Sequence, residues 1–402
     1  MTEEELLKKA KDFFAAGRFD LKKEKITGVI VPGSIGILGE TNEFNRGKVL
    51  SGNLDKSAVM MAQRRRENDR SVNMYSKKYD ENIRVMLNDA QSKQDNGWAN
   101  YIASTLFMLE SMSKRVPGMN LYIDNDIPDT FQSNHMEALE TGAAVIAGKL
   151  SDWQMSALEI AEICAQGEVN YMGRDKNTVK FIPSIGGRPG HLTYFDIKAA
   201  AVETLPFGIK GHLFMVLSSG VKKKTIEAKK KQVMADVAES IEIMRKNGAR
   251  FDTLDEITAE EFDDYRSKLS ITQRKRCAYF ISENDRVAEA KKAILAGNST
   301  ALIDIMNESH KNMKARLEIV EEESEILLDM LADTDGVKAV RMMNLGTDGS
   351  ILAVVDAEKR KVFESRLKKS FLSRTGLPLT IETSALTNEM RAFDIPETVF
   401  IK

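Results

Sequence analysis

Cysteine and histidine are scarce in this chain of 402 residues. The cysteines are Cys164 and Cys277, and neither stands near another cysteine. The four histidines are isolated from one another: His135, His191, His212 and His310. Zinc sites and disulfide frameworks need clustered ligands or paired cysteines, so this spacing argues against both.

The chain also lacks an excess of charge of one sign and a long apolar run. Its formal net charge is -2, whereas dedicated nucleic-acid binders carry a strong basic excess. No apolar run approaches the ~20 residues of a membrane helix. The first residues, Met1 to Glu5, are acidic and unlike a signal peptide. We therefore expect a cytoplasmic protein that binds neither nucleic acid nor a membrane.

What the chain has is enough apolar residues for a sizeable core. Hydrophobic residues make up 42% of it and charged residues 29%, and its length suits two domains. The turn-forming run Leu205-Pro206-Phe207-Gly208 indicates the boundary, so we predict domains over residues 1–205 and 206–402. Helical and strand patterns are mixed in both halves, which predicts an α+β fold.

Hydrophobic periodicity and turn residues predict the individual elements. Strands are expected at 26–31, 121–124, 191–197, 213–217, 337–342, 351–355 and 379–383. Helices are expected at 6–14, 98–113, 138–146, 156–164, 226–247, 286–295, 301–320, 326–331 and 362–374. Residues 181–190 are rich in proline and glycine and are expected to form a loop.

A segment with glycine at every third position follows the first predicted strand. It spans residues 32–45, Pro-Gly-Ser-Ile-Gly-Ile-Leu-Gly-Glu-Thr-Asn-Glu-Phe-Asn. By itself the glycine spacing is typical of a structural turn or a ligand loop. The segment resembles the galactokinase segment Pro-Gly-Arg-Val-Asn-Leu-Ile-Gly-Glu-His-Thr-Asp-Tyr-Asn. This resemblance implies sugar contacts by Glu40, Glu43 and Asn45. The family arginine near the transferred phosphoryl group is replaced by Ser34, which lacks the guanidinium charge.

The second resemblance falls on the segment that cradles phosphates in the galactokinases, Gly-x-Gly-Leu-Ser-Ser-Ser-Ala at a helix start. The family glycines let backbone N–H groups face the phosphates, and the serines bind phosphate and metal. Here residues 129–140 read Asp-Thr-Phe-Gln-Ser-Asn-His-Met-Glu-Ala-Leu-Glu. The helix is expected to remain while the anion site is lost. A rebuilt nucleotide loop would use Asn134 and His135; otherwise His135 is a solvent-facing residue or a residue at the helix start.

The third resemblance concerns the catalytic base, the Asp of the family motif Gly-x-Met-Asp-Gln. Residues 190–196 match the strand that follows this motif in the family, and counting back places Val179 at the base position. Valine cannot accept a proton from a sugar hydroxyl. A shifted loop would bring Asp175 into the base role; the alternative is that Asp175 is a surface residue beside Arg174 and Lys176.

Further segments match the family in the same order along the chain. Residues 282–287, Ser-Glu-Asn-Asp-Arg-Val, resemble a family helix start, with Ser282 expected as the cap. Residues 306–310 resemble Met-x-x-Ser-His, and residues 218–222 match a segment after the first strand of the second domain. Arg341 begins the last family signature, which has lost glycines here and is also explained by a hairpin turn.

The resemblance covers the chain from about residue 13 to its end and implies a two-domain GHMP-kinase-like fold. This fold joins an N-terminal half like domain 2 of ribosomal protein S5 to a ferredoxin-like C-terminal half. The first hypothesis is a protein without kinase activity that binds a sugar, a sugar phosphate or a protein partner. The second is an active ATP- and Mg²⁺-dependent kinase of altered specificity, and the third is a scaffold that binds no small molecule. Only the second requires a cofactor.

Overall fold

The computed structural model forms two compact units that are discontinuous in sequence. It describes residues 5, 8, 26–39, 41–65, 70–88, 94–128, 134–207, 211–220, 223–343, 345 and 349–395. The first unit comprises Met1–Ser34, Asn53–Pro189 and Thr387–Lys402; the second comprises Ile35–Gly52 and Gly190–Leu386. The predicted α+β class is confirmed, and the domain boundary after residue 205 stays a prediction. The helix predicted at 6–14 lies almost entirely outside the described residues.

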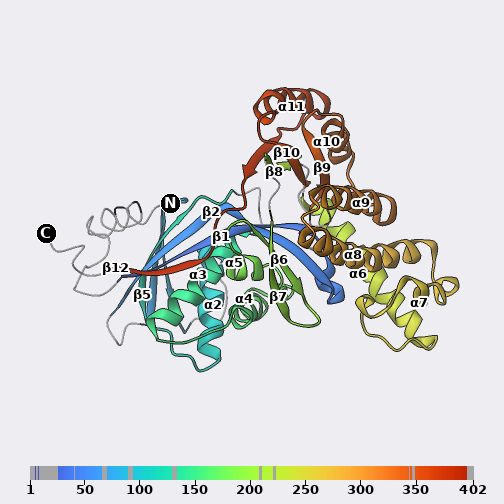
Figure 1. Ribbon diagram of the computed structural model, residues 1–402. Helices are drawn as coiled ribbons and strands as arrows, with labels where there is room; N and C mark the ends of the chain where they lie inside the picture. The colour runs from blue at the N-terminus through green and yellow to red at the C-terminus, as the bar shows by residue number, and fades with distance from the viewer. Residues whose placement is uncertain are drawn as a thin grey trace. The chain divides into compact units, whose positions relative to one another are not determined.

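The first unit is built on a mixed sheet with the order β12-β1-β2-β5-β3-β4; Figure 1 shows β12, β1, β2 and β5 of this sheet. The strands are β1 (Ile26–Leu38), β2 (Lys48–Arg64), β3 (Ser71–Ser76), β4 (Glu81–Met86), β5 (Met119–Asn125) and β12 (Arg391–Ile395). β5 runs antiparallel to β2 and parallel to β3. β12 comes from the end of the chain and pairs with β1 from Ile26↔Ile395 to Ile30↔Arg391. The sequence patterns did not predict β12.

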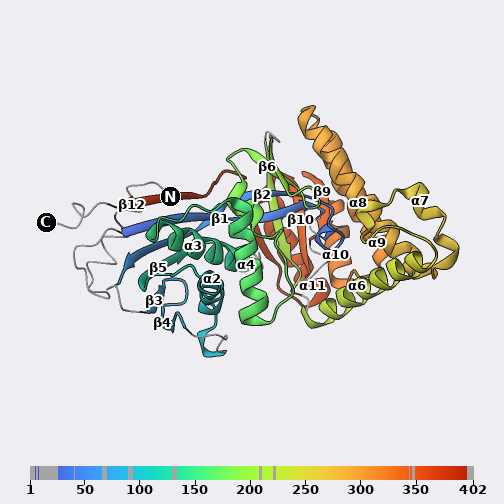
Figure 2. The same cartoon turned by 90° about the horizontal axis from the view of Figure 1, so that it is seen from below.

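The described helices of this unit are α2 (Ala99–Ser111), α3 (Asn134–Leu150), α4 (Ala157–Met172) and the short α5 (Ile182–Gly186). Figure 2 shows α2, α3 and α4 close together beside the sheet, and α2 packs on both of the others. Gly142 lets α3 approach β2 closely, since a Cβ there would lie 2.3 Å from the sulfur of Met60. The prediction of a loop at 181–190 is wrong for residues 182–186, because these residues form α5.

The second unit contains an antiparallel sheet with the order β11-β8-β10-β9. Its strands are β8 (His212–Ser218), β9 (Val337–Met342), β10 (Ser350–Asp356) and β11 (Thr380–Ser384). Strands β6 (His191–Asp196) and β7 (Ala201–Pro206) pair with each other, and β6 also pairs with residues 48–52 of β2. The inward faces of β8 and β10 supply Met215, Leu217, Ile351 and Ala353 to the core.

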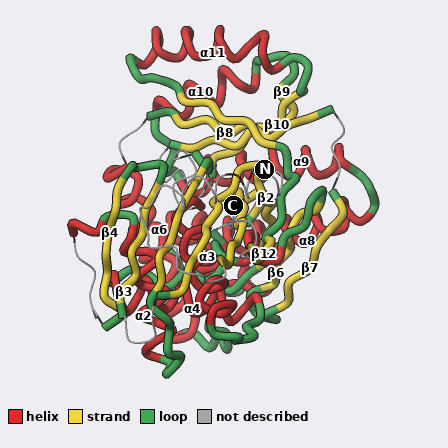
Figure 3. Tube along the Cα trace, turned by 90° about the vertical axis from the view of Figure 1, so that its left-hand side faces the viewer, coloured by secondary structure: helices red, strands yellow, loops and turns green. Residues whose placement is uncertain are grey.

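The helices of the second unit are α6 (Lys223–Lys246), α7 (Ala259–Asp263), α8 (Ile271–Leu295), α9 (Ser299–Leu317), α10 (Glu322–Ala332) and α11 (Arg360–Thr375). Figure 3 shows α10 and α11 together beside β8 and β10. The prediction that Ser282 caps a helix is wrong. α8 begins at Ile271, and its N-cap is Ser270, which lies twelve residues before Ser282 and forms a capping box with Gln273. The Ser282 hydroxyl instead donates to the carbonyls of Ala278 and Tyr279 inside the helix.

Among the described residues, no helix combines the length and apolar character needed to cross a membrane.

Candidate functional site

The glycine-rich segment ends β1 in a tight turn that only glycine fits. Gly39 has φ +71°, in the left-handed region. A Cβ at this position would lie 2.4 Å from the carbonyl oxygen of Lys48 and 2.6 Å from Cγ2 of Val287. The turn leads directly into η1, a single 3-10 turn over Asn42–Asn45. The glycine thus fixes the start of the segment predicted to contact sugar.

Of the three predicted sugar-binding residues, Glu43 and Asn45 lie in η1 of the second unit. Glu40 lies outside the described residues. Glu43 is half-buried in η1, and Asn45 is only 4% exposed. Within the described part of the chain, Nδ2 of Asn45 and Oδ1 of Asn42 are buried without a hydrogen-bond partner. Such atoms are rare in folded proteins and call for a water or a ligand, so η1 offers one donor and one acceptor.

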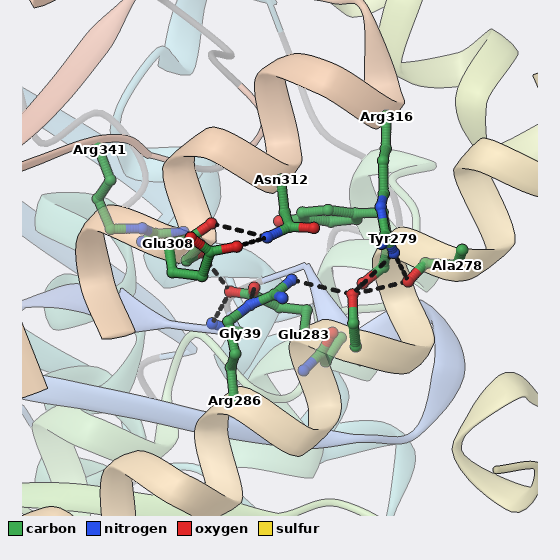
Figure 4. A network of polar contacts seen from close by, with 12 residues as sticks. Gly39, Ala278, Tyr279, Glu283, Arg286, Glu308, Asn312, Arg316 and Arg341 are labelled. Carbon is green, nitrogen blue, oxygen red and sulfur yellow. Dashed lines mark hydrogen bonds and ion pairs between the residues drawn. The ribbon is translucent and has the colours of Figure 1, made fainter. Parts of the chain in front are cut away.

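A buried carboxylate holds the Gly39 turn in place (Figure 4). Glu283 of α8 is fully buried. Its Oε1 accepts hydrogen bonds from the Gly39 N–H at 3.3 Å and from the Ser309 hydroxyl at 2.8 Å. Its Oε2 accepts from Nε of Arg286 at 2.8 Å. The next residue along α8, Asn284, accepts from the Lys48 N–H at 2.9 Å, so both ends of the turn are tied to one helix.

Arg341 of β9 also holds the Gly39 turn, through the backbone of Ile37, which lies two residues before Gly39. This guanidinium is 1% exposed, and its NH1 donates to the carbonyl oxygen of Ile37 at 3.0 Å. Burial, followed by the positive charges of Arg341 and Lys314, lowers the pKa of His310 to about 4. His310 is therefore neutral near pH 7. The Gly39 turn before η1 is thus held by residues from three parts of the chain that were identified by resemblance: 282–287, 306–310 and Arg341.

In the first unit, the position that the resemblance assigns to the catalytic base holds a buried apolar side chain. Val179 is 7% exposed and lies just before α5. Asp175 is exposed in the segment after α4. The guanidinium of the preceding residue, Arg174, donates to the Tyr101 hydroxyl at 2.5 Å and lies 3.5 Å from Oε1 of Glu168. The base role of Asp175 stays a prediction.

The residue after Val179 belongs to a buried ionic cluster that the sequence patterns did not reveal. Nζ of Lys180 lies 2.9 Å from Oε1 of Glu137 on α3 and 2.5 Å from Oε2 of Glu168 on α4. Glu140, one turn after Glu137, is fully buried and accepts from the Ser104 hydroxyl at 3.2 Å. Desolvation raises the pKa of Glu137 and of Glu140. The three carboxylates raise the pKa of Lys180 and outweigh its own burial, so it stays charged.

This cluster also changes the chemistry at the start of α3. The first turn of α3 carries Glu137, so a carboxylate stands where exposed N–H groups would otherwise favour an external anion. Asn134 is the first residue of α3, and its side chain lies outside the described residues. His135 is the second residue of α3, as one interpretation expected, but it is 6% exposed and so does not face solvent. Its Nε2 lies 3.3 Å from the Tyr79 hydroxyl.

The residues present do not fit a divalent metal ion near this helix start. Mg²⁺ is usually held by one or two carboxylates together with waters and substrate phosphates. Here Glu137 and Glu168 are bridged by the ammonium of Lys180. Across the described ranges, no group of three or more His, Cys, Asp or Glu side chains is arranged to hold a metal. Residues 129–133, where the phosphate-cradling segment would lie, are outside those ranges.

Comparison with known proteins places this geometry in a family context. The chain is 23% identical over 367 residues to a galactokinase of Streptococcus thermophilus, covering 90% of this chain and 94% of the relative. It superposes on the crystal structure of Lactococcus lactis galactokinase complexed with galactose with a TM-score of 0.85 and 22% identity, over 96% and 99% of the two chains. Methanococcus jannaschii mevalonate kinase gives a TM-score of 0.61 at 14% identity, over 92% and 100%. No family model matches the chain.

Proposed function

Since this chain belongs to the galactokinase family of the GHMP kinases, we propose that it binds a sugar or sugar phosphate without phosphorylating it at enzymatic rates. The protein would then act as a sensor or regulator, with a protein partner reading its ligand state. A cytoplasmic location belongs to the same proposal. The proposal is supported by buried Val179 at the position that the resemblance assigns to the catalytic base, and by the Lys180 ammonium that bridges Glu137 and Glu168 nearby.

The expected loss of rate follows from what phosphoryl transfer requires. The protein's contribution is positioning and charge neutralisation around the phosphates. A general base contributes roughly 10²–10⁴-fold, and one electrostatic donor about 10²–10³-fold. Val179 supplies no base, and Ser34 supplies no guanidinium. The two losses together amount to at least about four powers of ten, which would reduce a typical kinase to negligible turnover.

Sugar binding is supported by the second unit. The Gly39 turn keeps the frame that positions η1, and η1 presents the unpartnered Nδ2 of Asn45 and Oδ1 of Asn42. A sugar hydroxyl can both donate and accept a hydrogen bond, so it satisfies such a pair. Glu40 and Glu43 are proposed to add carboxylate acceptors. The Lactococcus lactis relative was solved with galactose, which makes galactose and related hexoses the first candidates.

The test of sugar binding uses thermal unfolding of the purified protein with galactose, other hexoses and their phosphates. A ligand that binds only the folded state raises the apparent melting temperature. Asn45→Ala removes a buried amide whose Nδ2 has no hydrogen-bond partner among the described residues, so it should leave stability within about 1 kcal/mol of wild type and abolish the response to sugar. Asn312→Ala, which loses hydrogen bonds to the carbonyl and the carboxylate of exposed Glu308, is the control. An unchanged sugar response in Asn45→Ala, or no response in wild type, would remove this proposal.

The second candidate is an active kinase that uses Asp175 as its base. The exposed position of Asp175 permits a loop rearrangement toward substrate. If the protein phosphorylates any sugar with Mg-ATP, Asp175→Ala should abolish that activity. Persistence of activity in this variant would exclude Asp175 from the base role.

A further inference from the structure

The buried lysine of the first unit is surrounded by carboxylates from two helices. Glu137 is the fourth residue of α3, and Glu168 lies near the end of α4. Their side chains are 3% and 1% exposed, and that of Lys180 is 15% exposed. The Lys180 ammonium also lies 5.0 Å from the ring centre of Phe181. The cation is thus enclosed by protein.

Lys180 is the cation that lies closest to the buried carboxylates of the cluster. Glu137, Glu140 and Glu168 are all buried, and buried carboxylates repel one another strongly in a medium of low dielectric constant. Arg174 approaches Glu168 only at 3.5 Å, and its side chain is 49% exposed. Lys180 is therefore the principal neutralising charge for the facing ends of α3 and α4.

A divalent metal ion would satisfy the same carboxylate pair. Hard cations prefer carboxylate oxygens, and Mg²⁺ commonly uses one or two of them and completes its shell with waters. A lysine ammonium is a compact point charge on a flexible stem. We propose that Lys180 is a resident cation that permanently occupies the Glu137–Glu168 pair and excludes divalent metal from it. This inference rests on the proposed function, because a protein that does not transfer phosphoryl groups has no need of metal at this helix start.

The proposal predicts that removal of the ammonium creates a metal site. Lys180→Met keeps most of the side-chain length and removes the charge. Mn²⁺ is the probe, since it resembles Mg²⁺ in ligand preference and its binding can be followed by the loss of free-ion electron paramagnetic resonance signal. Wild type should leave the Mn²⁺ signal and the melting temperature unchanged. Lys180→Met should bind Mn²⁺ and gain several degrees of apparent melting temperature at saturating ion.

Two further variants make the result specific. Lys180→Met combined with Glu168→Gln should lose the Mn²⁺ response, since one carboxylate of the pair is gone. Lys176→Met is the matched control, because Lys176 lies in the same segment but pairs with exposed Glu162 at the surface; it should behave as wild type. Equal Mn²⁺ binding by wild type and Lys180→Met, or none by folded Lys180→Met, would overturn the proposal.

Lys180→Met leaves buried carboxylates unpaired, so a second experiment covers a variant that is recovered unfolded. The experiment is then refolding with and without Mn²⁺, followed by circular dichroism. Recovery only with Mn²⁺ supports the resident-cation role. The control is the triple variant Lys180→Met, Glu137→Gln and Glu168→Gln, in which the cluster loses these charges. If this triple variant refolds but Lys180→Met does not refold with Mn²⁺, the proposal is overturned. None of these readouts uses ATP or a sugar, so detection of kinase activity in wild type would refute the proposed function and leave this result standing.

Discussion

Replacement of Glu283 by alanine should destabilise the second unit more than any surface change. The variant removes the acceptor for three groups: the Gly39 N–H, the Ser309 hydroxyl and the Arg286 guanidinium. Arg286 is itself buried, with 9% of its side chain exposed, and among the described residues it keeps its bond to the Ser282 hydroxyl at 3.1 Å. Breaking one side of a buried ion pair typically costs about 3–5 kcal/mol, and we expect Glu283→Ala to fall in this range.

Two comparison variants separate the charge from the packing. Glu283→Gln keeps the shape and one acceptor, so its cost should be about 1–3 kcal/mol, that of an unsatisfied buried group. Combined replacement of Glu283 and Arg286 by leucine removes both charges and should recover most of the loss, as replaced buried pairs generally do. Glu308→Ala on α9 is the control, since Glu308 is exposed and should cost less than about 1 kcal/mol.

The assay is urea denaturation, combined with hydrogen exchange at residues 39–48. The amides of Gly39 and Lys48 are both bonded to α8 side chains, and loss of Glu283 should speed exchange most at Gly39. A Glu283→Ala variant as stable as Glu308→Ala, with unchanged exchange at Gly39, would refute the idea that this carboxylate holds the turn.

Two other predictions concern Gly39 and His310 of the second unit. Gly39→Ala should lower the free energy of unfolding more than Gly173→Ala. Both glycines have positive φ, +71° and +68°, which costs an alanine about 1–2 kcal/mol, but a Cβ meets other atoms at Gly39 and none at Gly173. Equal losses of unfolding free energy in urea denaturation would contradict the predicted clash. The His310 pKa of about 4 lies below its ordinary 6.5, so the unfolded chain binds the extra proton first and stability falls as pH drops from 6.5 toward 4. At pH 5 this contributes about 2 kcal/mol relative to pH 8, and His310→Gln should be less pH-dependent than wild type by that amount; identical pH profiles would exclude this contribution.

Most elements of the fold could be predicted from sequence because local patterns dictate them. The apolar run at 213–217 and the periodic stripe of 226–247 correspond to β8 and α6. The start of α8 was missed because Ser282 and Ser270 are both serines preceding helical sequence, and only packing decides which one caps. Strand β12 was missed because its partner, β1, lies more than 360 residues away in sequence, a pairing without a local signal.

The candidate site was predictable only where chemistry is carried by contiguous residues. Segments 32–45 and 282–287 were identifiable as motifs, but the bond between Gly39 and Glu283 joins positions 244 residues apart. The Lys180 cluster was not predicted, because a lysine and three glutamates in separate segments are indistinguishable in sequence from solvated surface charges. Burial alone gives them their role.

The most direct measurement of the central claim is a single-turnover experiment with the protein in excess over ATP. Galactose or another hexose is added with Mg²⁺, and sugar phosphate is followed by mass spectrometry, with the Streptococcus thermophilus galactokinase run in parallel. We expect the relative to convert its ATP within seconds and this protein to form no sugar phosphate over hours while still binding the sugar. Stoichiometric sugar phosphate within minutes would contradict the account.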